Sequence, residues 1–302
     1  MLSALALLTI DIGIDPEIQE FGGLLLTWHG VFTAVGIALG VGVALVIGRR
    51  LGFIDDDIYS AALIAIPCGI VGARALFVFE SWGKPGVDDV IDIFRINEGG
   101  ISVYGAVIGG FAGGLVYGWI RKLPLRRGLD VAAVGLILGM GVGRIGDIIN
   151  GEHSAKVSDL PWAVRYTHLN SPSVLNHPEC GLNPIFGIQV KSLCAQHPAA
   201  AYEMIGDLLI FGLLLLLVRM GRDGIAFFSM LLLYSLMRFG VSELRVDSRE
   251  VIAGLTVPQV TALFLIPPSL IGLLYCWRRK ESAAPPASAP AKLAAATGPP
   301  AG

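Results

Sequence analysis

The sequence predicts an all-α polytopic membrane protein with seven transmembrane helices, and three observations lead to this prediction. Of the 302 residues, 54% are hydrophobic and only 15% are charged, with a mean hydropathy of +0.69. A soluble domain of this length would carry about a quarter charged residues. Seven apolar segments each approach the roughly 20 residues that a helix needs to cross a bilayer. Basic residues follow every second segment.

The apolar segments are expected to be helices because open, irregular backbone cannot face lipid. They span residues 22–48, 58–79, 100–120, 130–149, 202–218, 224–243 and 255–277. The first segment could instead be a signal sequence. It is too long for that, however, and it ends in two arginines without a small-residue cleavage pattern. We therefore expect it to be the first membrane helix.

The distribution of Lys and Arg predicts the orientation, because these residues gather in cytoplasmic loops. They follow the first, third, fifth and seventh segments, at residues 49–50, 121–127, 219–222 and 278–280. The N-terminus is then predicted to be periplasmic and the C-terminus cytoplasmic, in a bacterial cytoplasmic (inner) membrane. The predicted outer loops are residues 80–99, 150–201 and 245–254.

Composition divides the chain into three parts. Residues 1–21 are expected to form an N-terminal arm at the membrane interface, residues 22–280 the membrane domain, and the Pro/Ala-rich residues 281–302 a disordered cytoplasmic tail. Cys180 and Cys194 fall in the long outer loop, where an oxidising compartment would allow a disulfide. They could equally be two unpaired thiols. The cysteine spacing predicts no metal site.

Ionisable side chains at membrane depth are costly and usually functional. The candidates toward the outer ends of the helices are Arg74, Arg144, Arg238, Arg245, Glu203 and Asp207. Arginine presents a planar fork that matches a phosphate. A phospholipid headgroup is the phosphate most available at that depth, so converging arginines predict a phospholipid site. The alternative is that each pair of arginine and acid only stabilises helix packing.

Two polar stretches could contribute to such a site. In GRIGDIINGEH, residues 143–153, Asp147 and Asn150 follow Arg144 at i+3 and i+6, so the three share one helix face. Glu152 lies further round, at the helix end. The EGG of residues 98–100 precedes the third helix, where the backbone N–H groups of its glycines, Gly99 and Gly100, could face an anion.

These and other motifs resemble, in order, those of the bacterial prolipoprotein diacylglyceryl transferases. The resemblance covers most of residues 22–277, and the chain would be a divergent member. The motifs are WHGVF (28–32), GARALFVFE (72–80), IFRINEGGISVYGAVIGG (93–110), GRIGDIINGE (143–152), DLPWAV (159–164), HPAAAYE (197–203), RFGVSELRVD (238–247) and GLTVPQ (254–259).

The resemblance implies an activity and its partners. The family enzyme transfers the diacylglyceryl group of phosphatidylglycerol to the cysteine of a prolipoprotein signal peptide as a thioether, and glycerol phosphate leaves. The implied partners are phosphatidylglycerol, prolipoprotein signal peptides and the bilayer; no cofactor, metal or nucleic acid is expected. Arg144 and Arg238 would be the main phosphate contacts, with Arg245 and Glu152 at the periplasmic mouth. If the chain is an active transferase, His29 would need to be largely unprotonated at the working pH to take the proton of the thiol.

Several positions depart from the family pattern. His29 stands where the family usually has Tyr, Tyr104 where it has His, and Asp147 where it has Asn. The first two could be an exchange of partners between helices, independent drift, or misalignment. The glutamate of the sixth helix is displaced by one step, from Ser242 to Glu243, which turns the side chain about 100° around the helix. His29, Tyr104 and Glu243 remain candidate catalytic residues.

Three functions are open at this point. The first is an active diacylglyceryl transferase. The second is a related membrane enzyme that keeps the phospholipid site but uses another acceptor, as the long loop 166–201 would allow. The third is a non-catalytic phospholipid-binding protein that has lost the proton-transfer geometry. A transporter is disfavoured because inverted repeats and broken helices are not evident.

Overall fold

The computed structural model describes residues 9–22, 24–83, 87, 89, 100, 102–175, 184–185, 188–189 and 195–279. Gly99, Cys180, Cys194 and the tail 281–302 lie outside this part, so what the sequence predicts for them stays a prediction. Within it, seven helices are long and apolar enough to cross a membrane, which confirms the predicted fold class. They are α2 (Trp28–Arg50), α3 (Asp55–Ser81), α4 (Val103–Ile120), α5 (Leu125–Asn150), α7 (Ala199–Leu217), α8 (Ile225–Ser242) and α9 (Val257–Arg278).

The first membrane helix begins at Trp28, not at residue 22 as the hydropathy predicted. The apolar residues before it form β3 (Leu24–Thr27), which pairs antiparallel with β2 (Glu17–Phe21). Thr27 then caps α2, because its Oγ1 accepts the backbone N–H of Gly30 at 3.2 Å. Such a cap satisfies an N–H group that has no partner within the helix.

Helices α2 and α5 cross with their backbones in contact. A Cβ atom at Gly40 would lie 2.6 Å from the carbonyl oxygen of Gly135. Near the end of α5, a Cβ atom at Gly146 would lie 2.6 Å from the Cα atom of His29. Small residues allow this approach between membrane helices. The crossing therefore holds the first turn of α2 against the last turns of α5.

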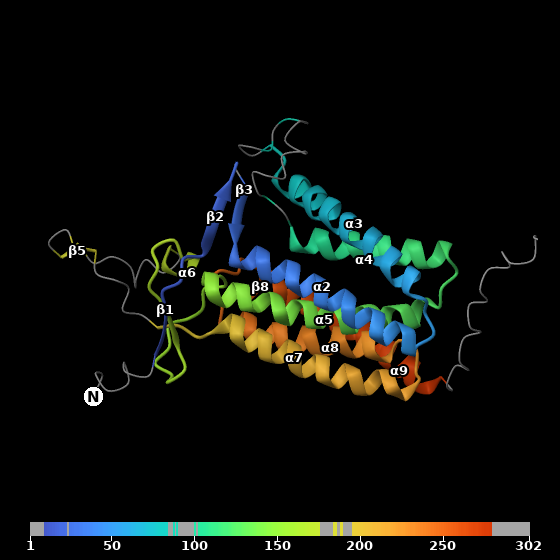
Figure 1. Ribbon diagram of the computed structural model, residues 1–302. Helices are drawn as coiled ribbons and strands as arrows, with labels where there is room; N and C mark the ends of the chain where they lie inside the picture. Colours follow the sequence, from blue (N-terminus) through green and yellow to red (C-terminus); the bar gives the residue numbers. More distant parts are fainter. Residues whose placement is uncertain are drawn as a thin grey trace, which may run out of the picture.

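Helices α3 and α4 form a second closely packed pair. A Cβ atom at Gly105 would lie 2.2 Å from the carbonyl oxygen of Gly72. In Figure 1 the pair runs as a layer of its own beside α2 and α5, with α7, α8 and α9 on the opposite side of α5. The central position of α5 gives its side chains access to both neighbouring layers.

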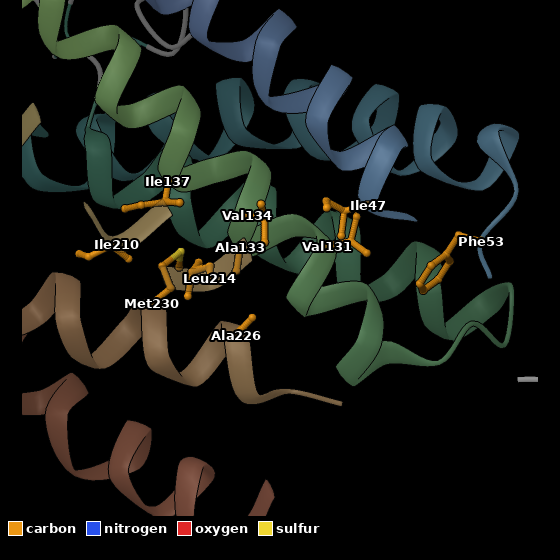
Figure 2. Packing of buried hydrophobic residues seen from close by; sticks show 10 residues of the cluster. All are labelled: Ile47, Phe53, Val131, Ala133, Val134, Ile137, Ile210, Leu214, Ala226 and Met230. Carbon is orange, nitrogen blue, oxygen red and sulfur yellow. The ribbon is translucent and has the colours of Figure 1, made fainter. Parts of the chain in front are cut away.

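The apolar core lies in one half of the bundle (Figure 2). It takes side chains from the second half of α2 and the loop after it, the second half of α7, and the first half of α5 and α8. These segments meet because consecutive membrane helices alternate in direction. Its buried members are Ile47, Phe53, Val131, Ala133, Val134, Ile137, Ile210, Leu214, Ala226 and Met230. The charged residues Arg144, Glu203 and Arg238 occupy the other halves of their helices, and so they gather at the opposite end.

Short strands surround that charged end. β1 (Ile10–Ile12) pairs in parallel with β4 (Val164–Tyr166), and β7 (Glu250–Ile252) pairs antiparallel with β8 (Leu255–Thr256). The remaining short elements are the hairpin of β5 (Pro184–Ile185) and β6 (Ile188–Gln189), the helix α6 (Pro172–Leu175) and the 3₁₀ turn η3 (Val218–Met220). Figure 1 shows β1 to β3 at one end of the bundle and the last turn of α9 at the other.

Candidate active site

Glu203 is the centre of an ion-pair cluster where α5, α7 and α8 meet. Its carboxylate is fully buried, and the guanidinium groups of Arg144 and Arg238 both contact it. Nη1 of Arg245, which follows α8, lies 3.5 Å from the same carboxylate. Three of the predicted arginines therefore converge, as the sequence indicated, and one buried acid holds them together.

Asp147 is a second centre, one turn of α5 beyond Arg144. Its Oδ2 accepts from Nη1 of Arg144 at 2.7 Å and lies 3.2 Å from Nε2 of His153, while its Oδ1 lies 2.5 Å from Nδ1 of His29. Asp147 is almost completely buried, whereas the side chain of His29 is 45% exposed. One carboxylate thus orients two histidines and one arginine, with an accessible imidazole at its outer side.

Glu152 and Asn150 complete this end of α5. Nδ2 of Asn150 donates to Oε1 of Glu152 at 3.0 Å, and the other carboxylate oxygen lies 3.6 Å from Nδ1 of His29. The helix ends at Gly151, whose φ of +73° is one that glycine adopts without strain.

The loop after α5 fixes this helix end by hydrogen bonding to its last carbonyl groups. Tyr166 donates to the carbonyl of Ile148 at 3.0 Å, and Ser171 donates to that of Asn150 at 2.9 Å. Carbonyl groups in the last turn have no partner within the helix, so these bonds hold the chain where Glu152 and His153 follow.

The sequence analysis gave no role to His153 or Asp247. Nδ1 of His153 lies 2.8 Å from Nη2 of Arg245, which also contacts Asp247 at 2.8 Å. Burial raises the pKa of the Asp247 carboxyl, but its contacts with His153 and Arg245 lower it further, so that the pKa lies below its ordinary value. The position of His153 directly after GRIGDIINGE could have indicated it as a candidate site residue. Its proximity to the chain after α8 could not be predicted from the sequence.

Four other candidate residues lie outside these two centres: Arg74, Gly100, Tyr104 and Glu243. Arg74 donates to the carbonyl of Gly100 at 2.9 Å, within the pair of α3 and α4. The hydroxyl of Tyr104 accepts from Thr261 at 3.4 Å, so its partner is on α9 and not on α2. These contacts give His29 and Tyr104 different partners, and the exchange between them stays a hypothesis.

Glu243 is the fourth of these candidates. Its side chain is 70% exposed and lies 3.2 Å from Nζ of Lys156, whereas Ser242, one step earlier, is buried. A shift of one residue turns a side chain by about 100°. The displaced glutamate therefore points to the outside of the bundle, and the position that faces inward carries a hydroxyl.

A cavity of about 440 Å³ opens beside the cluster. Its walls are mostly apolar and come mainly from β1, β4 and the start of α7, and Glu152 and His153 also line it. Ligand sites are commonly cavities of this size, with few polar groups on apolar walls. The cavity therefore reaches the charged end of the bundle at Glu152 and His153.

His29, Asp147 and Glu152 are the group within the described residues whose spacing would suit a metal ion, since their ligand atoms lie within 4.8 Å of one another. Asp147 already accepts from the Arg144 guanidinium, which places a positive charge directly beside the group. This charge would repel a metal ion held by the three side chains.

The sequence relationships of the chain identify its family. Residues 16–276 match the prolipoprotein diacylglyceryl transferase family. The chain belongs to this family. Relatives named phosphatidylglycerol–prolipoprotein diacylglyceryl transferase occur in Clostridioides difficile, Oceanobacillus iheyensis and Staphylococcus saprophyticus. They are 29%, 31% and 33% identical to this chain, over 86%, 88% and 84% of it and 94%, 89% and 86% of their own lengths.

Proposed function

We propose that the protein transfers the diacylglyceryl group of phosphatidylglycerol to the lipobox cysteine of prolipoproteins, forming a thioether and releasing glycerol phosphate. Family membership and the names of the relatives support this activity. The observation that carries it is the convergence of three arginines on Glu203, beside a histidine held by Asp147.

The arginines are the groups that would bind the phosphate. Glu203 contacts one terminal nitrogen of each guanidinium, and each guanidinium has five N–H groups in all. The acid thus orients Arg144 and Arg238 while other N–H groups can donate to phosphate oxygens. Their positive charge would stabilise the phosphate as it leaves, in a site where little water reaches them.

His29 would act as the base for the thiol. Its Nδ1 donates to Asp147, so the neutral ring carries its lone pair on Nε2. A thiol with a pKa of about 8.5 is mostly protonated near neutral pH, and a histidine is suited to remove that proton. The sulfur then attacks the glycerol carbon that bears the phosphate, and the carbon–oxygen bond breaks.

The location of the site follows from the distribution of basic residues. Arg49, Arg50 and the 121–127 loop lie at the end of the bundle away from the arginine cluster. By the positive-inside rule that end is cytoplasmic. The cluster then lies toward the periplasmic face of a bacterial inner membrane, where exported prolipoproteins present their cysteine.

Turnover by the purified protein tests the proposal. The protein in detergent would receive phosphatidylglycerol and a lipobox peptide, and both glycerol phosphate and lipidated peptide would be measured. We expect equal amounts of the two products. His29→Ala should abolish turnover while retaining lipid binding, and Arg144→Ala should weaken lipid binding. If glycerol phosphate appears without modified peptide, another acceptor is used; if lipid binds and neither product appears, the transferase proposal is wrong.

A further inference from the structure

His153 has an unusual backbone and unusual neighbours. Its φ is +65°, a left-handed conformation that is strained for a non-glycine residue and that clusters at functional sites. This conformation places the imidazole between the end of α5 and the chain after α8. Arg144 lies 2.7 Å from its Nε2, and Arg245 lies 2.8 Å from its Nδ1.

In its protonated form, the ring has a mismatch of donors with Arg245. Guanidinium groups only donate hydrogen bonds. A neutral ring can satisfy both sides, with Nε2–H donating to Oδ2 of Asp147 at 3.2 Å and Nδ1 accepting from Nη2 of Arg245 at 2.8 Å. The protonated ring carries a second N–H at Nδ1, and this N–H faces the N–H of Arg245. On the Nδ1 side, the nearest carboxylate oxygen belongs to Asp247 and is 3.7 Å away, beyond hydrogen-bond distance.

An anion would resolve this mismatch. A phosphate oxygen between Nδ1–H of His153 and Nη2 of Arg245 would accept from both groups. The ring also borders the 440 Å³ cavity, and its side chain is 23% exposed, so a substrate can reach it. Among the described residues, the charged groups that face the ring are Arg144 and Asp147 on α5 and Arg245 and Asp247 after α8.

We propose that His153 is the general acid that protonates the leaving phosphate, an assignment that rests on the proposed transferase function. The thiol proton goes to Nε2 of His29, and the sulfur–carbon bond forms as the carbon–oxygen bond breaks. The electron pair of the broken bond goes to the phosphate oxygen, which takes the Nδ1 proton of His153. The proton on His29 then replaces the one that His153 lost, by exchange through solvent, so one thiol proton leaves on glycerol phosphate.

Asp147 links His29 and His153 into an acid–base pair, because it contacts both rings. One of its oxygens faces His29 at 2.5 Å and the other faces His153 at 3.2 Å. A carboxylate at this position can hold both rings in fixed orientations, as an orienting acid does in catalytic triads. An asparagine would present one oxygen acceptor and could not hold two N–H donors on separate oxygens.

The test compares His153→Gly with the wild-type protein. Glycine suits the positive φ, so this variant should fold. Ala253→Gly, at an exposed position with a φ of +51°, is the matched control for the backbone change. We expect His153→Gly to lower kcat about a hundredfold, the usual contribution of a general acid, while Ala253→Gly keeps the wild-type value. Imidazole added to the buffer should restore kcat in the glycine variant, in a saturable manner.

The pH profile supplies a second readout that a purely structural role would not move. In the wild type, kcat should fall on the alkaline side as the acid loses its proton, and His153→Gln should lose that limb. An unchanged kcat in His153→Gly, or a loss that imidazole does not restore, would overturn the assignment. A wild-type protein without turnover would instead overturn the transferase proposal itself, and the role of His153 with it.

Discussion

Replacing Glu203 with glutamine should lower the free energy of unfolding, and the contacts of the three arginines indicate by how much. Arg144 keeps Asp147 at 2.7 Å and Arg245 keeps Asp247 at 2.8 Å, whereas the carboxylate contact of Arg238 in the described structure is with Glu203. One mostly buried cation therefore loses its counter-charge. Removal of one partner of a buried ion pair costs about 3–5 kcal/mol, and we expect the lower value because two of the three arginines keep an acid.

Thermal unfolding in detergent measures this effect. A loss of about 3 kcal/mol corresponds to a decrease in Tm of about 6–12 °C for a domain of this size. Asp207→Asn is the matched control: Asp207 is also fully buried on α7, one turn after Glu203, but its carboxylate oxygens have no hydrogen-bond partner in the described residues. It should change Tm much less.

A double mutant separates the ion pair from other effects. The double substitution Glu203→Gln with Arg238→Gln should lower the free energy of unfolding by about 2 kcal/mol less than the sum of the two single substitutions. Phosphatidylglycerol should also raise the Tm of Glu203→Gln more than that of the wild type, because the anion supplies the missing charge. If Glu203→Gln is as stable as the wild type, or if the two substitutions are additive, Glu203 does not hold the arginines as described.

Two further predictions concern the helix crossing and the rim of the site. Gly40→Ala should destabilise the protein by about 1–3 kcal/mol, since its Cβ would lie 2.6 Å from the backbone oxygen of Gly135. Gly42→Ala in the same helix, with no atom within 4 Å of the added Cβ, should be neutral or slightly stabilising, and equal losses in Tm would refute the role of the crossing. Asp247 has a lowered pKa, so its stabilisation is present above about pH 4 and is lost as the pH falls toward its folded pKa. The difference in Tm between wild type and Asp247→Asn should therefore shrink below about pH 4; a constant difference from pH 7 to pH 3 would contradict this.

Hydropathy and length predicted the seven helices because each crossing requires a long apolar run, which is a local property of the sequence. They failed at residues 24–27, where an apolar run forms a strand that pairs with β2. Apolarity alone does not distinguish a short strand from the first turns of a helix. The arm 1–21 also contains strands. One of them, β1, pairs with β4, which lies about 150 residues further along the chain.

The candidate site was predictable where it depended on helix periodicity. The i+3 spacing of Arg144 and Asp147 gives the contact seen at 2.7 Å. It was not predictable where it depended on the rotation of one helix against another. Glu243 faces outward, Arg74 serves the pair of α3 and α4, and Glu203 rather than a substrate is the common partner of the arginines.

The roles proposed for His29 and His153 depend on a single acid, because Asp147 contacts both rings. The two histidines come from different helix ends, so no spacing in the sequence brings them together. If the pair is catalytic, the three residues act as one unit, and the losses of kcat on replacing Asp147 and either histidine should not be additive.

The ion pairs around Glu203 have a consequence for selectivity among anions. Three arginines face three carboxylates there, from Glu203, Asp147 and Asp247, so the cluster carries no surplus of positive charge. A small inorganic anion must compete with carboxylates that are covalently tethered at a high local concentration. Only a ligand with additional contacts, such as acyl chains in the bilayer, would compete well. The same competition favours the departure of glycerol phosphate, which has no acyl chains, and should make product inhibition weak.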